Sequence, residues 1–159
     1  MPQPAKLTRT RAQRVLRRLI EPARRGRTAS VTIEAAHLPG EPVSVTEAAR
    51  LDYVPFAVGD PWGPMWGTTW FRVGGAVPRE WKGAKVALVV HLGYGGATGF
   101  GAEGLVWSGE RPAQGISPNH REVLVAERAA GDDDVSVLIE AASNPPIDPF
   151  ADPAPYYLA

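Results

Sequence analysis

The chain contains no cysteine among its 159 residues. This absence excludes disulfide bonds, thiolate-ligated zinc and a cysteine nucleophile. Long apolar runs are also missing: the longest, "VALVV", has the length of a strand and falls far short of the roughly 20 residues that cross a bilayer. At the basic N-terminus, Arg17 and Arg18 interrupt "VLRRLI", so no signal-peptide core is present there. We therefore expect a soluble, cytoplasmic protein without a membrane segment.

Residue patterns typical of catalysis are scarce as well. His37, His91 and His120 lie far apart, and none has the spacing of a metal-binding motif. Among the carboxylates, Glu103 and Glu140 are the first candidates for an acid pair, but no feature of the sequence places them side by side. The sequence thus predicts no catalytic residue, no metal site and no cofactor for this chain.

Glycine and proline, in contrast, are abundant, with 17 and 16 residues. This composition favours many short strands joined by turns over long helices. Gly99, Gly101 and Gly104 fit the pattern G-x-G-x-x-G, which suggests a nucleotide loop. However, the strand-like "LVW" follows where a dinucleotide-binding loop requires a helix, so we interpret the segment as a connection between strands.

After Arg27 the apolar residues follow a period of two, which predicts strands. The predicted strands are "SVTIEA", "TTWFRV", "AKVALVV", "GLVW", "EVLVA" and "DVSVLIEAA". The third of these is apolar on both faces, since Ala87 and Val89 alternate with Val86, Leu88 and Val90. The sequence therefore predicts an all-β sandwich over residues 28–144, with an outer face partly covered by a helix or by a missing partner.

The first 27 residues predict a basic amphipathic helix. The helix is expected between Thr8 and Arg25, with a cap at Thr8 or Thr10 and an end at Gly26. One face carries an apolar stripe formed by Ala12, Val15, Leu16, Leu19, Ile20 and Ala23. Residues 1–27 hold nine basic residues and one acid, which leaves eight basic and sixteen acidic residues in the remainder. We expect the stripe, especially Val15, Leu16, Leu19 and Ile20, to contact another domain or subunit, and we expect no nucleic-acid partner.

Three of the five tryptophans lie within the stretch "DPWGPMWGTTWF". Trp70 is expected in a strand, with Phe71 pointing to the opposite face, and we predict that Trp70 is mostly buried. Trp62 and Trp66 are expected on the preceding loop. Packing against another domain or against each other is the favoured interpretation, and carbohydrate binding by stacking on a sugar is the alternative.

The tail at residues 145–159 is rich in proline and shows no periodicity, so we expect a linker. The chain ends at "PYYLA" with no further element, which is typical of a chain cut before its next domain. The predicted organisation is a helix at 1–27, a β-sandwich at 28–144 and a linker at 145–159 toward a missing domain.

The segment "WGTTWFRVGGAVPREWKGAKVALVVHLG" resembles the β-sandwich of galactose-binding (jelly-roll) type that accompanies many glycosidases. With "VPFAVGDPWG", "AEGLVWSGERPAQGISPNHREVLV" and "IEAASNP", the chain resembles the N-terminal region of bacterial class II α-mannosidases of glycoside hydrolase family 38, the cytosolic and vacuolar type. The individual motifs are weak, and it is their order and spacing that carry the resemblance.

This resemblance implies a non-catalytic N-terminal module of an enzyme that hydrolyses terminal α-mannosides with retention. It also implies that zinc and a carboxylate nucleophile belong to a catalytic domain that follows, because the "H-x-D" motif of the zinc site is lacking here. The implied partners are that catalytic domain and further copies of the full-length enzyme. A carbohydrate-binding β-sandwich module remains the alternative.

Overall fold

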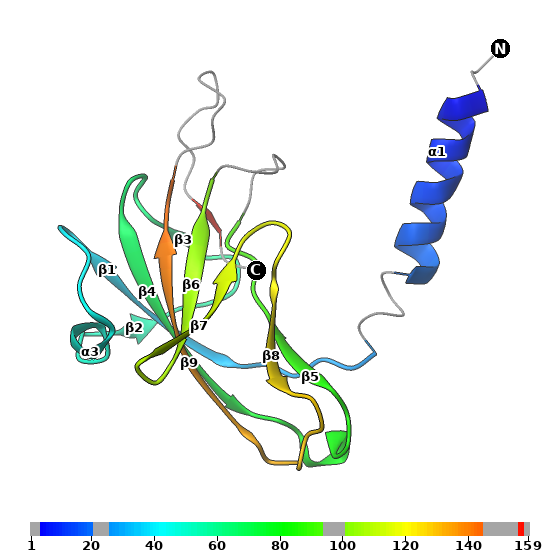
Figure 1. The fold of residues 1–159 in the computed structure, drawn as a ribbon. Coiled ribbons are helices and arrows are strands. Elements are labelled where there is room, and N and C mark those ends of the chain that lie inside the picture. The colour runs from blue at the N-terminus through cyan, green and yellow to red at the C-terminus, as the bar shows by residue number, and fades with distance from the viewer. Residues whose placement is uncertain (1–3, 21–25, 94–100, 145–155, 158–159) are drawn as a thin grey trace. The chain divides into compact units, whose positions relative to one another are not determined.

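The computed structural model describes residues 4–20, 26–93, 101–144 and 156–157. The chain divides into two compact units, residues 1–30 and residues 31–159 (Figure 1). The first contains the helical segment, and the second contains all the strands. This confirms the prediction of an all-β domain behind one N-terminal helix.

The N-terminal unit consists of helix α1 (Pro4–Val15), followed by the π-helical turn η1 (Leu16–Ile20). The helix begins at Pro4, so the predicted start at Thr8 or Thr10 is wrong. Proline is well tolerated in the first helical turn, because its missing N–H has no partner there. Thr10 lies inside the helix and donates its hydroxyl proton to the Lys6 carbonyl at 3.0 Å. The predicted end near Gly26 depends on residues 21–25, which lie outside the described part.

Six antiparallel strands form the main sheet of the second unit, in the order β2-β1-β4-β9-β6-β7 (Figure 1). Their bounds are β1 Thr32–Leu38, β2 Val54–Pro55, β4 Thr68–Ala76, β6 Glu103–Ser108, β7 Arg111–Ile116 and β9 Asp134–Ala142. Two short two-stranded sheets complete the unit, one of β5 (Val86–Val89) and β8 (Glu122–Ala126), the other of β3 (Pro61–Trp62) and β10 (Tyr156–Tyr157). The 3-10 turn η2 (Arg79–Trp81) follows β4.

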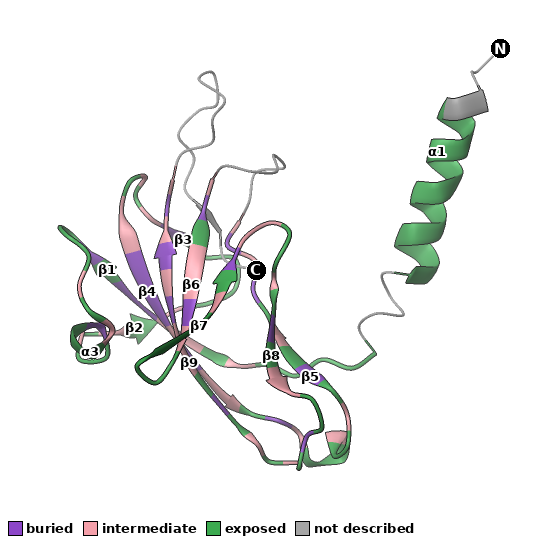
Figure 2. Ribbon diagram, in the orientation of Figure 1, coloured by how far each residue is buried: buried purple, intermediate pink, exposed green. Residues whose placement is uncertain are grey.

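The two longest strands, β4 and β9, pair along their whole length at the centre of the main sheet. Both strands carry a row of apolar residues on one face, and β4 also buries Trp70 on the other face. Trp70 and Phe71 are adjacent in β4, point to opposite faces and are both fully buried. Figure 2 shows the buried residues concentrated on these central strands. The predicted burial of Trp70 is thus confirmed.

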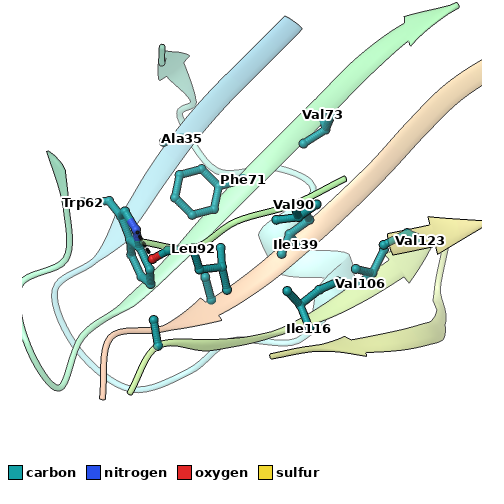
Figure 3. Packing of buried hydrophobic residues seen from close by; sticks show 12 residues of the cluster. Ala35, Trp62, Phe71, Val73, Val90, Leu92, Val106, Ile116, Val123 and Ile139 are labelled. Carbon is teal, nitrogen blue, oxygen red and sulfur yellow. Dashed lines mark hydrogen bonds between the residues drawn. The ribbon is translucent and has the colours of Figure 1, made fainter. Parts of the chain in front are cut away.

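The main core lies on the Phe71 face of the sheet. It includes Val73, Leu92, Val106 and Ile139, together with residues from the β5–β8 pair (Figure 3). Apolar side chains from two facing layers fill the space between them, as in other β-sandwiches. Residues that are distant in sequence therefore depend on one another for burial.

A second, smaller core covers the Trp70 face. The one-turn helix α3 (Val45–Ala48) lies in a segment that packs on this face through Ala48, Leu51 and Tyr53. Ser44 caps α3: its hydroxyl accepts a bond from the Glu47 N–H, and the Glu47 carboxylate accepts one from the Ser44 N–H at 3.0 Å. The sequence pattern did not predict this helix, because one turn is too short to show a period.

Arg72 fastens the α3 segment to the sheet. Its guanidinium lies 3.8 Å from the centroid of the Tyr53 ring and 3.2 Å from the Glu34 carboxylate. It also donates a hydrogen bond to the Ala49 carbonyl at 3.1 Å. Arginine suits this position, since its planar group can stack on a ring and bind two acceptors at once.

Candidate functional site: the tryptophan turn

Trp62 is a core residue. It is 5% exposed, its ring lies edge-on to Phe71 with a centroid separation of 5.6 Å, and its Nε1 donates to the Leu92 carbonyl at 3.2 Å (Figure 3). The sequence analysis placed Trp62 on a loop as a candidate for sugar stacking. The structure places it instead on β3, where the core covers its ring, so a sugar cannot reach it. Its burial depends on Leu92 and Phe71, and the local sequence does not show that they are its neighbours.

Trp66 has the opposite environment. Its side chain is 79% exposed, the largest exposure among the large hydrophobic residues of the described structure. Its backbone has a φ of 64°, in the left-handed region that non-glycine residues rarely adopt. Such a conformation persists only where the surrounding structure enforces it, and it is a pointer to function.

Ser143 enforces the conformation of the turn at residues 64–67. The Ser143 carbonyl accepts a bond from the Trp66 N–H at 2.9 Å, and the Ser143 N–H donates to the Gly67 carbonyl at 3.1 Å. Its hydroxyl accepts from the Gly67 N–H at 3.1 Å and lies within hydrogen-bond distance of the Pro64 carbonyl. Ser143 is 1% exposed, so water does not compete for these bonds. The sequence analysis did not identify Ser143, which carries no motif of its own.

Gly67 is required in this turn for steric reasons. A Cβ atom at this position would lie 2.9 Å from His37 Cε1 and 2.9 Å from the Pro64 carbonyl oxygen. Real Cβ atoms are not found at such distances from other atoms, so only glycine fits. The turn therefore has a fixed conformation, and it exposes an indole ring to solvent.

The polar neighbours of the turn come from β6 and from the residue after Ser143. Asn144 Nδ2 donates to Glu103 Oε1 at 3.1 Å. The register pairs Thr68 with Ala142, and Ala142 with Glu103, so Glu103 and the turn lie at the same end of the sheet.

Glu140, the other carboxylate singled out from the sequence, has a different partner. It accepts a hydrogen bond from Trp107 Nε1 at 3.3 Å. The register places Glu140 opposite Leu105, two residues along β6 from Glu103. The two carboxylates therefore share a face of the sheet, but each is bound by its own donor.

The histidines lie in three separate places. His37 Nδ1 is 3.4 Å from the Thr69 hydroxyl, His91 Nδ1 accepts from the Gly93 N–H at 3.0 Å, and His120 lies in the β7–β8 connection. Within the ranges that the structure describes, no three histidine or acidic side chains are grouped closely enough to hold a metal ion. Gly99 lies outside those ranges, and β6 begins shortly after Gly101, as predicted.

Two further apolar surfaces are exposed, each considered within its own unit. In α1 and η1, Val15, Leu16, Leu19 and Ile20 are all exposed, with Leu19 at 66%. In the β-sandwich, Val89 and Leu124 are exposed on the outer face of the β5–β8 pair. The predicted second apolar face of β5 is therefore present and faces outward.

The tail predicted to be a linker contributes a strand to the domain. Tyr156 and Tyr157 form β10 and pair with Trp62 and Pro61 of β3. A strand of two residues is too short to show a period, which explains why the sequence analysis did not find it. Residues 145–155 lie outside the described part.

A β-sandwich with these features matches a known class of domain. Residues 28–157 match the family model described as "Alpha-mannosidase, jelly roll domain", and the chain belongs to this family. The resemblance to α-mannosidases inferred from the sequence is thereby confirmed at the level of the family, and the fold is a jelly roll. The matched region ends at the last residue of β10.

Individual relatives agree with this assignment. The chain is 31% identical over 123 residues to alpha-mannosidase 2C1 of Homo sapiens and to that of Mus musculus, and the alignment covers 75% of this chain and 11% of each relative. It is 27% identical over 109 residues to alpha-mannosidase G of Dictyostelium discoideum, covering 65% of this chain and 9% of the relative. The chain thus spans about a tenth of the length of the curated relatives it matches. Among the described residues, no helix is long and apolar enough to cross a membrane.

Proposed function

We propose that this chain is the non-catalytic N-terminal module of an enzyme that hydrolyses terminal α-mannosides in the cytoplasm. The module packs on the catalytic part of the enzyme and supports its oligomeric assembly. The catalytic part carries the zinc ion and the carboxylate nucleophile of a retaining class II α-mannosidase. Membership in the α-mannosidase jelly-roll family supports this role, as does the small share of each relative that the module spans.

The observation that carries the packing role is the outer face of the β5–β8 pair. Ala87 lies opposite Leu124, and Val89 lies opposite Glu122. Leu124 is 48% and Val89 37% exposed, although the other face of the same two strands belongs to the core. A pair of strands with apolar residues on both faces is expected to have both faces covered in the mature protein.

The basic helix α1 supports the assembly role. Its apolar residues are exposed, and the described residues 4–20 include six basic residues and no acid. The rest of the chain is acidic, so a neighbouring subunit presents charge of the opposite sign to the helix.

The test of the packing role uses Leu124→Glu, made both in this chain and in the full-length enzyme. A charge on a solvent-exposed strand position changes the stability of this chain little, within about 0.5 kcal/mol. In the full-length enzyme the same charge would be buried, and we expect a loss of thermal stability and of α-mannosidase activity. Val54→Glu is the matched control, because Val54 is 60% exposed on the edge strand β2. Equal behaviour of the two variants in the full-length enzyme would contradict the packing role.

Leu19→Glu tests the assembly role in the same way. We expect it to lower the molecular mass of the full-length enzyme in solution, measured by light scattering. An unchanged mass and an unchanged stability would contradict the role of the helix.

A separate assay tests the non-catalytic character of the module. This chain alone is expected to show no turnover of an aryl α-mannoside with added zinc, and no tight one-to-one zinc binding, whereas the full-length enzyme turns over the same substrate. Turnover that survives further purification of this chain would contradict the proposal. Glu103 and Glu140 would then be the first residues to substitute.

The second candidate function is that of a carbohydrate-binding module. The exposed Trp66 ring, with the hydrogen-bonded Glu103 and Asn144 at the same end of the sheet, is the observation that favours it. An aromatic ring stacks on the apolar face of a sugar, and carboxylate and amide groups bind its hydroxyls.

A further inference from the structure

The chain's last described strand, β10, pairs with β3. In β10, Tyr156 lies opposite Trp62, and Tyr157 lies opposite Pro61. The family match ends at residue 157, which is also the last residue of this β3–β10 ribbon. The ribbon is fixed to the module through Trp62, whose ring is in the core.

Two exposed apolar residues flank β3 in the sequence. Val58 precedes Pro61 by three residues and is 66% exposed, and Trp66 follows Trp62 by four residues and is 79% exposed. In the jelly-roll unit these are the two most exposed of the large hydrophobic residues that the structure describes. Both residues therefore lie within four residues of the strand that pairs with β10.

From these observations we infer that Trp66 is the anchor by which the module docks on the polypeptide that follows residue 157 in the α-mannosidase, with Val58 as a secondary contact. This inference rests on the proposed function and names the surface that carries it. The occupant is that polypeptide segment, and the anchor is an indole ring inserted into it.

The conformation of Trp66 fits the role of an anchor. Tryptophan buries a large area with only two side-chain torsions to fix, and it dominates the binding energy of many interfaces. The bonds from Ser143 and the tight fit at Gly67 hold the backbone before any partner arrives, which reduces the conformational cost of docking. A ring placed only for the stability of the module would be buried in it, as Trp62 and Trp70 are.

Oxidative footprinting with mass spectrometry tests the inference without any substitution. In this chain, Trp66 should be oxidised fastest, while Trp62 and Trp70 should be protected. In the full-length enzyme, the oxidation of Trp66 relative to the partly buried Trp81 should fall about ten-fold or more, because the centre of an interface excludes water. An unchanged ratio would overturn the inference.

Adding methyl α-mannoside to this chain separates the sugar-binding alternative. Protection of Trp66 by the sugar in this chain would overturn the inference and favour the carbohydrate-binding module. The α-mannosidase activity of the full-length enzyme is measured in parallel. If the enzyme turns over substrate while Trp66 is freely oxidised, the docking surface is refuted and the proposed function stands. If Trp66 is protected but the enzyme shows no turnover, the proposed function is refuted and the docking surface is supported.

Trp66→Gly provides a second, independent test. Glycine adopts the left-handed backbone without strain, so the melting temperature of this chain should change by no more than about 2 °C. In the full-length enzyme the loss of the anchor should lower the melting temperature of the module and increase its proteolysis. A drop of equal size in this chain would show that Trp66 stabilises the module itself, and an unchanged full-length enzyme would show that nothing docks on it. Either result would overturn the inference.

Discussion

A comparison of Trp62 with Trp70 measures how much one buried hydrogen bond contributes to the free energy of unfolding. Both rings are buried, and both lie against another aromatic ring. The Trp62 indole donates to the Leu92 carbonyl, whereas Trp70 Nε1 is buried and has no hydrogen-bond acceptor in the described part of the protein. Tryptophan to phenylalanine removes the indole N–H in each case, but it breaks a bond in only one.

The two substitutions share a cost from lost volume. Each leaves a cavity on the order of 40 Å³, which is worth about 1 kcal/mol in the free energy of unfolding. Trp62→Phe also leaves the carbonyl of the fully buried Leu92 without this donor, which adds about 1–3 kcal/mol. Trp70→Phe removes an unpartnered donor, and this change offsets much of the cavity cost. We expect a loss of about 2–4 kcal/mol for Trp62→Phe and of about 1 kcal/mol or less for Trp70→Phe.

The assay is urea unfolding of this chain, followed by circular dichroism because the substitutions alter the fluorescence. The denaturant dependence should be unchanged, so that the midpoints report stability alone. If Trp70→Phe costs as much as Trp62→Phe or more, the hydrogen-bond reasoning is refuted and ring volume decides both cases.

Two further predictions concern the segment that covers the Trp70 face. Arg72→Ala removes the stacking on Tyr53 and the bonds to Glu34 and Ala49. We therefore expect faster amide hydrogen exchange around α3, with the exchange of the central strands unchanged. Uniformly faster exchange in all strands would contradict this local role. The hydrogen bonds from the Ser44 side chain and backbone lower the pKa of Glu47, so the stability that this carboxylate contributes is present at neutral pH and is lost as the pH falls through its lowered pKa. Glu47→Gln should therefore reduce stability at neutral pH but not at acid pH, and a loss that is independent of pH would contradict the capping role.

The strands that could be predicted from the sequence are those in which apolar and polar residues alternate, and those that consist of an uninterrupted apolar run. The bounds of β8 and β9 agree with the predicted segments "EVLVA" and "DVSVLIEAA". Strand β7 was missed because it is an edge strand whose sequence "RPAQGI" includes proline and glycine, and most of its residues are exposed. Its position is fixed by pairing with β6, which the local sequence does not reveal.

In the candidate site, too, some features could be predicted from the local sequence and others could not. The burial of Trp70 followed from its place in a strand, and the exposure of Trp66 agrees with a loop position. The difference between Trp62 and Trp66 could not be predicted, because both follow a proline or methionine in similar glycine-rich surroundings. It arises from contacts distant in sequence: Leu92 and Phe71 enclose Trp62, and Ser143 turns Trp66 outward.

The pairing of β4 with β9 has a consequence for synthesis of the protein. Gly67 and Ser143, which meet at one end of this pair, are 76 residues apart in the chain. During translation, β4 leaves the ribosome with Trp70 and Phe71 uncovered. It cannot pair with β9 until most of the domain has been synthesised. Such distant pairing slows folding and leaves an apolar strand open to other chains meanwhile. Ribosome-bound chains that end before β9 are therefore expected to recruit chaperones, and those that extend past Ser143 are expected to release them.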